Sequence, residues 1–121
     1  MARVSKGAVG EVLAARYLRD KGYTIEAANY RCRFGEIDII ASDETYIVFV
    51  EVKTRAENSL YHPREAVTRM KQHRIIKTAK LFLQQHPSKR QPRFDVIEVT
   101  TKVGRPMEPV HVEHLENAHG G

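Results

Sequence analysis

Residues 46–54 read Tyr-Ile-Val-Phe-Val-Glu-Val-Lys-Thr, and this stretch is the strongest indication of the fold. β-Branched and aromatic residues fill it, as is typical of a β-strand. Because side chains alternate faces along a strand, Phe49, Glu51 and Lys53 share one face and the intervening valines take the other. Both faces are apolar up to Glu51, which predicts a central strand covered on both sides. Glu51 and Lys53 then lie where the buried stretch ends.

The segments on either side predict two helices and four more strands. A helix is expected from Ser5 to about Lys21, and a second from Pro63 to near His86, after a loop over residues 54–62. The further strands are expected over residues 24–31, 36–41, 93–100 and 109–115. This αβββαββ order predicts an α/β fold with a central mixed sheet. The 121 residues fit one domain, residues 1–121.

Composition narrows the class of protein. A chain that is 41% hydrophobic and 29% charged is typical of a globular domain. The longest apolar run, Ile47–Val50, is far shorter than the ~20 residues of a membrane helix. No apolar signal segment follows Met1, and the single cysteine, Cys32, excludes an intrachain disulfide framework. We therefore expect no membrane association and a cytoplasmic location.

Positive charge is concentrated in one part of the chain. Residues 53–93 hold eleven Lys and Arg against two acids, a net charge of +9, within a total of +5. The remaining residues, with nine basic and thirteen acidic side chains, carry −4. A strongly basic surface usually binds phosphate, so nucleic acid is the expected partner. A solvated helix face is the alternative explanation.

Asp38 is the first unusual acid, because it stands between isoleucines in the second expected strand. Strict alternation would put Ile37 and Ile39 on one face, and Asp38 with Ile40 on the other. An unpaired carboxylate among apolar side chains is costly. Asp38 is therefore expected to have a partner.

The hairpin between the second and third strands decides whether the acids meet. A two-residue turn at residues 43–44 would pair residues whose numbers sum to 87, placing Asp38 opposite Phe49 and diagonal to Glu51. Any odd sum keeps Asp38 on the face of Glu51 and Lys53, whereas an even sum separates them. We expect an odd register and one shared site.

Glu11 is a third candidate, because helical periodicity places it in the apolar arc of the first helix, near Ala15 and Leu18. A structural ion-pair network of Glu11, Asp38, Glu51 and Lys53 is one explanation for the buried acids. Three acids with one lysine leave negative charge uncompensated, however, and Mg²⁺ prefers such oxygen ligands. No Cys/His cluster has the spacing of a zinc site.

Two strings carry a family resemblance: Gly35–Ala41, which reads Gly-Glu-Ile-Asp-Ile-Ile-Ala, and Val48–Arg55, which reads Val-Phe-Val-Glu-Val-Lys-Thr-Arg. Supporting matches are Gly10-Glu11, Gly22-Tyr23, Glu65-Ala66-Val67 and Arg93–Ile97. With them the chain resembles, over nearly its whole length, the bacterial YraN family of endonuclease-like proteins. That family is similar to the restriction-endonuclease-like superfamily, especially archaeal Holliday junction resolvases. The resemblance implies a restriction-endonuclease-like αβββαββ core, with its central mixed sheet flanked by helices.

The resemblance also implies an active site. In the superfamily an Asp on one strand and a Glu-x-Lys on the next hold a catalytic metal ion, and these map to Asp38, Glu51 and Lys53. The implied ion is Mg²⁺, with Mn²⁺ as a substitute, held by Asp38, Glu51 and the backbone carbonyl of Val52. Lys53 would orient a water or stabilise developing charge, and Glu11 would hold a water or a second ion. Ile37 stands where the superfamily motif often has proline.

The second helix offers a surface for phosphate. Arg69, His73, Lys77 and Lys80 are spaced so that they form an exposed ridge opposite the apolar arc. A second line of basic residues, Lys71 and Arg74, is expected to face the active-site cleft. Arg55 and Arg64 flank the loop after the third strand, where they would contact substrate.

The function favoured by this sequence is metal-dependent hydrolysis of phosphodiester bonds in DNA, with branched or structured DNA as a candidate substrate. One alternative is a non-catalytic nucleic-acid-binding module that retains the nuclease fold, and another is a protein-interaction scaffold. The intact Asp38, Glu51 and Lys53 favour the enzyme over the binding module. Similarity to resolvases makes a homodimer a further expectation.

Overall fold

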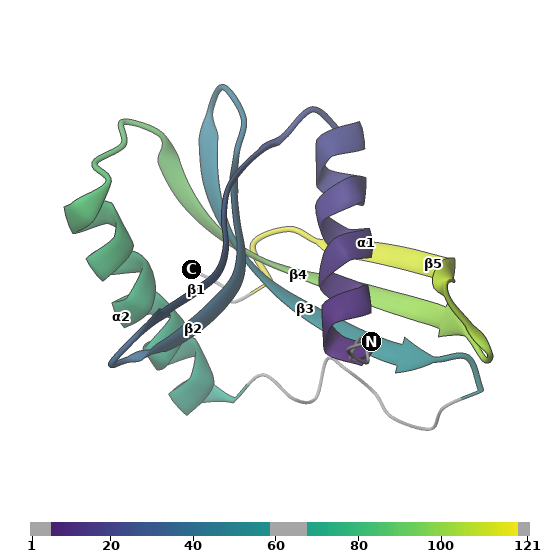
Figure 1. Cartoon of the computed structure of the whole chain (residues 1–121). Coiled ribbons are helices and arrows are strands. Elements are labelled where there is room, and N and C mark those ends of the chain that lie inside the picture. The colour runs from purple at the N-terminus through teal and green to yellow at the C-terminus, as the bar shows by residue number, and fades with distance from the viewer. Residues whose placement is uncertain (1–5, 59–67, 119–121) are drawn as a thin grey trace, which may run out of the picture.

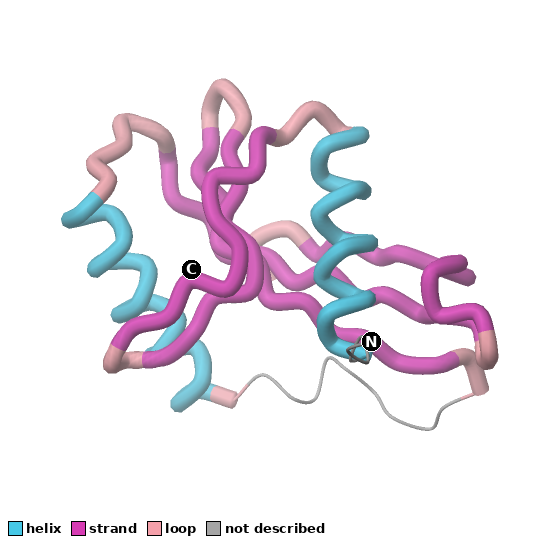
Figure 2. The backbone as a smooth tube through the Cα atoms, viewed as in Figure 1, coloured by secondary structure: helices cyan, strands magenta, loops and turns pink. Residues whose placement is uncertain are grey.

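The computed structural model describes residues 6–58 and 68–118. Its elements follow the expected αβββαββ order: α1 (Lys6–Asp20), β1 (Thr24–Cys32), β2 (Gly35–Ser42), β3 (Tyr46–Ala56), α2 (Arg69–Gln85), β4 (Gln91–Lys102) and β5 (Arg105–Leu115). The strands form one mixed sheet in the order β1-β2-β3-β4-β5, in which β3 and β4 are parallel and the other neighbours are antiparallel. The predicted α/β fold is confirmed (Figures 1 and 2).

The sheet separates two apolar cores, one under each helix (Figure 1). On the α1 face, Leu18 packs with Val48 and Val50. On the α2 face, Phe49 lies 5.5 Å from the ring of Phe94 and 6.1 Å from that of Phe82. β3 is therefore apolar on both faces because it is central and covered on both sides, as its sequence predicts.

α1 approaches the sheet closely at Gly10. A Cβ at this position would lie 1.7 Å from the Thr54 hydroxyl oxygen, so only glycine fits without movement. Small side chains in α1 thus let the helix lie directly on β3. This contact fixes α1, and Glu11 with it, beside the carboxyl-terminal half of β3.

The hairpin register is odd, as expected, but its sum is 89 rather than 87, since Ile39 pairs with Val50 and Ser42 pairs with Ile47. The connection holds three residues because the Asp43 carboxylate accepts the N–H groups of Thr45 and Tyr46, at 2.9 and 2.7 Å. Extending this register sets Asp38 opposite Glu51 rather than opposite Phe49.

Strict alternation along β2 fails at Asp38. Ile39 belongs to the α1 core, whereas Ile37 and Ile40 both belong to the α2 core, so the expectation that Ile37 and Ile39 share a face was wrong. β1 is irregular beside this point, where Asn29 has a left-handed φ of 53°. The break turns the Asp38 carboxylate toward β3, and its Oδ2 accepts the Val52 N–H at 2.8 Å.

Most element ends lie within two residues of expectation, including those of β4, and the larger differences are in β3, α2 and β5. β3 continues to Ala56 because it pairs in parallel with β4 as far as Thr101, so the loop expected from residue 54 begins later. α2 begins at Arg69, where Thr68 is the N-cap and accepts the Lys71 N–H at 3.1 Å; the expected start at Pro63 lies outside the described residues. β5 begins at residue 105 rather than 109. Within the described ranges, no helix combines the length and apolarity needed to cross a membrane.

Candidate functional site

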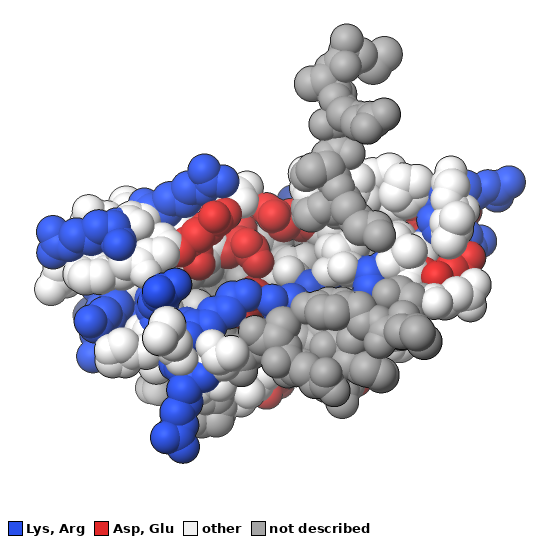
Figure 3. Space-filling view, turned by 90° about the horizontal axis from the view of Figure 1, so that it is seen from below, with Lys and Arg blue, Asp and Glu red and all other residues white. Residues whose placement is uncertain are grey.

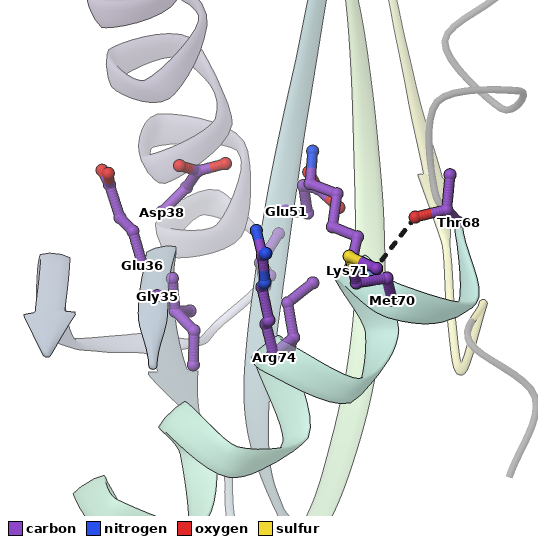
Figure 4. A pocket seen from close by; sticks show the side chains of 11 residues that line it. Gly35, Glu36, Asp38, Glu51, Thr68, Met70, Lys71 and Arg74 are labelled. Atoms are coloured by element: carbon purple, nitrogen blue, oxygen red, sulfur yellow. Dashed lines mark hydrogen bonds and ion pairs between the residues drawn. The ribbon is translucent and has the colours of Figure 1, made fainter. Parts of the chain in front are cut away.

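A cavity of about 440 Å³ opens between β2, β3 and the first turns of α2, where β2 turns away from β3. Three acids line it, Glu36, Asp38 and Glu51, together with two basic side chains of α2, Lys71 and Arg74. Figure 4 shows Glu36 and Asp38 on one side of the cavity, and Lys71 reaching from α2 to Glu51 on the other. The space-filling view places a group of acidic side chains on this face with basic ones beside it (Figure 3).

Glu51 is the most constrained acid in the cavity, with a side chain only 9% exposed. Its Oε1 receives two ammonium groups, Lys53 Nζ at 2.9 Å and Lys71 Nζ. Its Oε2 is buried and has no hydrogen-bond partner within residues 6–58 and 68–118. A buried carboxylate oxygen without a partner costs roughly 1–3 kcal/mol, so this oxygen is poised to accept a further ligand.

The Asp38 carboxyl has an unusual proton affinity. Burial raises its pKa from 3.8 to about 6, against the opposing hydrogen bond from the Val52 N–H. The negative charges of Glu11, Glu51 and Glu36 contribute to the same rise. Perturbed carboxyl groups in a cavity are typical of functional sites.

Glu11 lies close to this group without lining the cavity. Partial burial raises its pKa, a hydrogen bond with the Asn29 side chain lowers it, and the charge of Glu36 raises it. Within residues 6–58 and 68–118, no three His, Cys, Asp or Glu side chains are grouped as a metal site. The structure therefore brings Asp38 and Glu51 together at one cavity, while Glu11 acts on Asp38 through its charge.

The two lysines at Glu51 differ in proton affinity. Burial and the neighbouring Lys71 ammonium lower the pKa of Lys53, whose side chain is only 11% exposed. Burial also opposes the charge of Lys71, but its hydrogen bond to the Glu51 carboxylate raises its pKa. Both ammonium groups pair with the same carboxylate oxygen of Glu51, and burial opposes the charge of each.

The remaining predicted residues divide by position. Arg69, Lys77 and Lys80 are exposed on α2, as expected of a ridge. Arg55 lies on β3 rather than in a loop and is not among the described residues that line the cavity. Val52 donates its N–H to Asp38, while the role of its carbonyl stays a prediction. Arg64 lies outside the described residues.

Sequence reasoning missed two contributions to this cavity. Glu36 was placed on the same strand but given no role, although it lines the cavity and raises the pKa of Asp38. Lys71 was assigned to nucleic acid alone, yet it pairs with Glu51. The helical periodicity already predicted that Lys71 faces the cleft, but its ion pair with Glu51 could not be predicted from the sequence.

A second buried charge network lies on the α1 face, and the sequence analysis gave it no role. Asp95 on β4 accepts hydrogen bonds from Arg93 at 2.9 Å and from the Asn117 N–H at 2.9 Å, and it contacts His114 Nε2 at 2.6 Å. Arg93 also donates to the Tyr23 hydroxyl at 2.6 Å. Arg93 and Asp95 alternate with apolar residues along the strand, and this pattern could have predicted that the two charged side chains are buried together.

The fold and cavity define an α/β domain of the αβββαββ type with an acidic site where β2 separates from β3. Residues 10–99 match the model of the Uncharacterised protein family UPF0102. A UPF0102 protein of Clostridium botulinum (strain Loch Maree / Type A3) is 50% identical over 95 residues, 77% of each chain. Another, from Caldanaerobacter subterraneus subsp. tengcongensis, is 48% identical over 103 residues, 82% of this chain and 84% of that protein. The chain belongs to the UPF0102 family, which is the YraN family that its sequence resembles.

Proposed function

We propose that this protein is a metal-dependent nuclease that hydrolyses phosphodiester bonds in DNA, with Asp38, Glu51 and Lys53 at its active site. One observation carries the proposal. Two acids from adjacent strands meet at one cavity, and one of them keeps a buried carboxylate oxygen without a partner. A purely structural network would be expected to satisfy that oxygen.

The two carboxylates at the cavity are of the donor type that a hard divalent cation binds. Carboxylate oxygens are the ligands that Mg²⁺ prefers, and Glu51 Oε2 and the Asp38 carboxylate supply them here. The like charges that raise the pKa of Asp38 are those that a cation would compensate. Asp38 and Glu51, with the Val52 carbonyl, would hold Mg²⁺ or Mn²⁺, which would neutralise developing charge on a phosphate and lower the pKa of a water.

The side chains around these acids have separate roles in the proposal. Lys53, held at 2.9 Å from Glu51 and with a lowered pKa, would orient the attacking water or stabilise charge at the phosphate. Glu11 keeps the surroundings of Asp38 negative and so favours cation binding. Arg74, on the α2 wall of the cavity, would contact a phosphate oxygen.

DNA is the proposed partner because exposed cations continue from the cavity along α2. Arg69, Lys77 and Lys80 would contact the phosphate backbone without reading sequence. A cytoplasmic location and a homodimer, in which two such cavities act on two strands, belong to the same proposal.

The test is cleavage of labelled duplex, flap, fork and four-way-junction DNA with Mg²⁺, and with EDTA as the metal-free control. We expect cleavage that requires Mg²⁺ and falls by about 100-fold or more in Asp38→Asn and Lys53→Met. The matched control is Glu108→Gln, which removes an exposed β5 acid paired with Lys102, and it should retain the activity. Equal cleavage by all four proteins would assign the activity to a contaminant and overturn the proposal.

A non-catalytic DNA-binding module is the second candidate, and one observation favours it. Two ammonium groups already neutralise Glu51 through Oε1. Metal-independent DNA binding by an inactive parent protein, unchanged in Asp38→Asn, would support this candidate over the nuclease.

A further inference from the structure

A second hollow, of about 390 Å³, lies beside the cavity between the β1–β2 turn and α2. Its walls are the half-buried ring of Phe34, three basic side chains and the stems of two α2 residues. The lining residues are Arg33, Phe34, Lys77, Lys80, Leu81 and Gln84. No part of the proposed chemistry uses Phe34.

The turn that carries Phe34 is fixed in place. The Phe34 N–H donates to Cys32 Sγ at 3.3 Å, and that thiol donates to the Thr78 hydroxyl of α2 at 3.7 Å. These contacts tie the turn to the helix, so the ring is held in position before any ligand arrives. Preorganisation of this kind lowers the entropic cost of binding.

Cations surround the ring. The Arg33 guanidinium carbon lies 4.8 Å from the ring centre, and Lys77 Nζ lies 5.6 Å from it. Lys80 lines the same hollow. A flat apolar ring or guanidinium plane accepts a base by stacking, and the neighbouring cations accept the phosphates on either side.

The hollow continues the acidic cavity. Gly35, the residue after Phe34, lines the cavity, and so does Arg74, which lies one helical turn before Lys77. A strand with a phosphate at Asp38 and Glu51 therefore has a basic path over Arg74 to Phe34.

We propose that the hollow binds an unpaired base of a DNA strand, stacked at Phe34 with its phosphates on Lys77 and Lys80. A base within a duplex is already stacked, and extracting it costs a few kcal/mol. The site therefore selects single-stranded DNA or the unpaired part of a branched molecule. The inference rests on the proposed function for its link to a cleaved phosphate, but the binding itself requires no hydrolysis.

The experiment measures binding in EDTA, by fluorescence anisotropy, to short single-stranded oligonucleotides in which one abasic nucleotide is moved along the strand. Base–aromatic stacking contributes about 1–3 kcal/mol per base, so the parent protein should lose about tenfold in affinity at one abasic position. Phe34→Leu keeps the apolar volume but removes the aromatic face. It should bind the intact strand about tenfold more weakly and show no added loss at that position.

Two controls separate stacking from charge. Lys80→Gln should weaken binding while keeping the abasic effect, and its salt slope should fall by about 0.7 for single strands. Lys102→Gln, at the far β4–β5 hairpin, should leave both affinity and abasic effect unchanged (Figure 1).

The outcomes distinguish this inference from the nuclease. Position-dependent loss that vanishes in Phe34→Leu supports the stacking site even if the protein never cleaves DNA. An abasic effect that persists in Phe34→Leu, or duplex binding as tight as single-strand binding, overturns the inference while leaving the nuclease intact. Failure to bind any DNA overturns both.

Discussion

Two buried carboxylates, those of Asp95 and Glu51, lie on opposite faces of one sheet and differ in their hydrogen-bond partners. Asp95 is fully buried, and both of its oxygens accept hydrogen bonds, from Arg93, His114 and Asn117. Burial would raise the pKa of Asp95, but these hydrogen bonds hold it below its usual value. Glu51, by contrast, leaves one buried oxygen without a partner.

The contrast distinguishes Asp95, whose two oxygens both have partners, from the acids that we propose to be functional. The Arg93 and His114 side chains and the Asn117 N–H supply partners for both oxygens of Asp95, and Arg93 extends this network to the hydroxyl of Tyr23. At the cavity, one oxygen of Glu51 has no hydrogen-bond partner among the described residues, and burial together with the neighbouring acids raises the pKa of Asp38 to about 6. Carboxyl groups with raised pKa values are concentrated at functional sites, which supports the role that we propose for Asp38.

The largest expected effect is that of Asp95→Asn. The substitution removes the negative charge while Arg93 stays buried, and loss of one member of a buried pair costs about 3–5 kcal/mol. The measurement is the free energy of unfolding from urea titration, compared with Glu108→Gln, an exposed acid. A loss below about 1 kcal/mol would remove the distinction between the two carboxylates.

Asp38→Asn, unlike Asp95→Asn, should increase the free energy of unfolding of the metal-free protein. With a pKa of about 6 when folded and 3.8 when unfolded, the carboxyl keeps the fold's stability at low pH and loses it as pH rises through about 6. Asn, whose carbonyl still accepts the Val52 N–H, removes that penalty. The gain should be small near pH 4 and reach about 1–2 kcal/mol near pH 8.

The measurement is thermal or urea unfolding of the parent protein and Asp38→Asn in EDTA, from about pH 4 to about pH 8. A variant less stable at every pH would show that Asp38 is a structural partner, as Asp95 is.

A smaller effect is expected from Lys71→Met. The Lys71 ammonium pairs with Glu51 in competition with any metal ion, and its side chain is 41% exposed, so the pair is worth at most about 1 kcal/mol. Its removal should tighten Mn²⁺ binding by up to about fivefold, measured by titration calorimetry. Weaker Mn²⁺ binding would show that Lys71 supports the site.

The smallest expected effect is at the exposed ridge. Lys77→Gln should lower affinity for duplex DNA only slightly, and reduce the log–log salt slope by about 0.9 if it contacts one phosphate. Lys102→Gln is the matched control. Identical slopes in both variants and the parent would leave Lys77 as ordinary solvated surface.

The sequence predicted the element order because periodicity and turn residues are local signals. It also predicted that Asp38 and Glu51 meet, because only the parity of the hairpin was needed, and parity survives a shift of two residues. The expected pairing of residues in this hairpin was wrong by two positions. The Asp43 carboxylate accepts two backbone N–H groups and so enlarges the turn, and the alternation of apolar residues does not reveal these hydrogen bonds.

Other features depend on tertiary contacts that the sequence does not encode locally. The break in alternation at Asp38 accompanies the left-handed φ of Asn29 on the neighbouring strand. The start of α2 is set by Thr68, whose capping role becomes visible only once the helix is placed. The pairing of Lys71 with Glu51 joins residues twenty apart in the chain through the packing of α2 on the sheet.

The proposed cation site depends most on Glu51 Oε2, the buried oxygen that has no partner among the described residues. Mn²⁺ titration followed by electron paramagnetic resonance tests it directly, with parent protein, Glu51→Gln and the control Glu108→Gln. The predicted result is saturable binding that Glu108→Gln keeps and Glu51→Gln loses by about tenfold or more. Equal Mn²⁺ binding by all three proteins, or none by the folded parent, would contradict the claim.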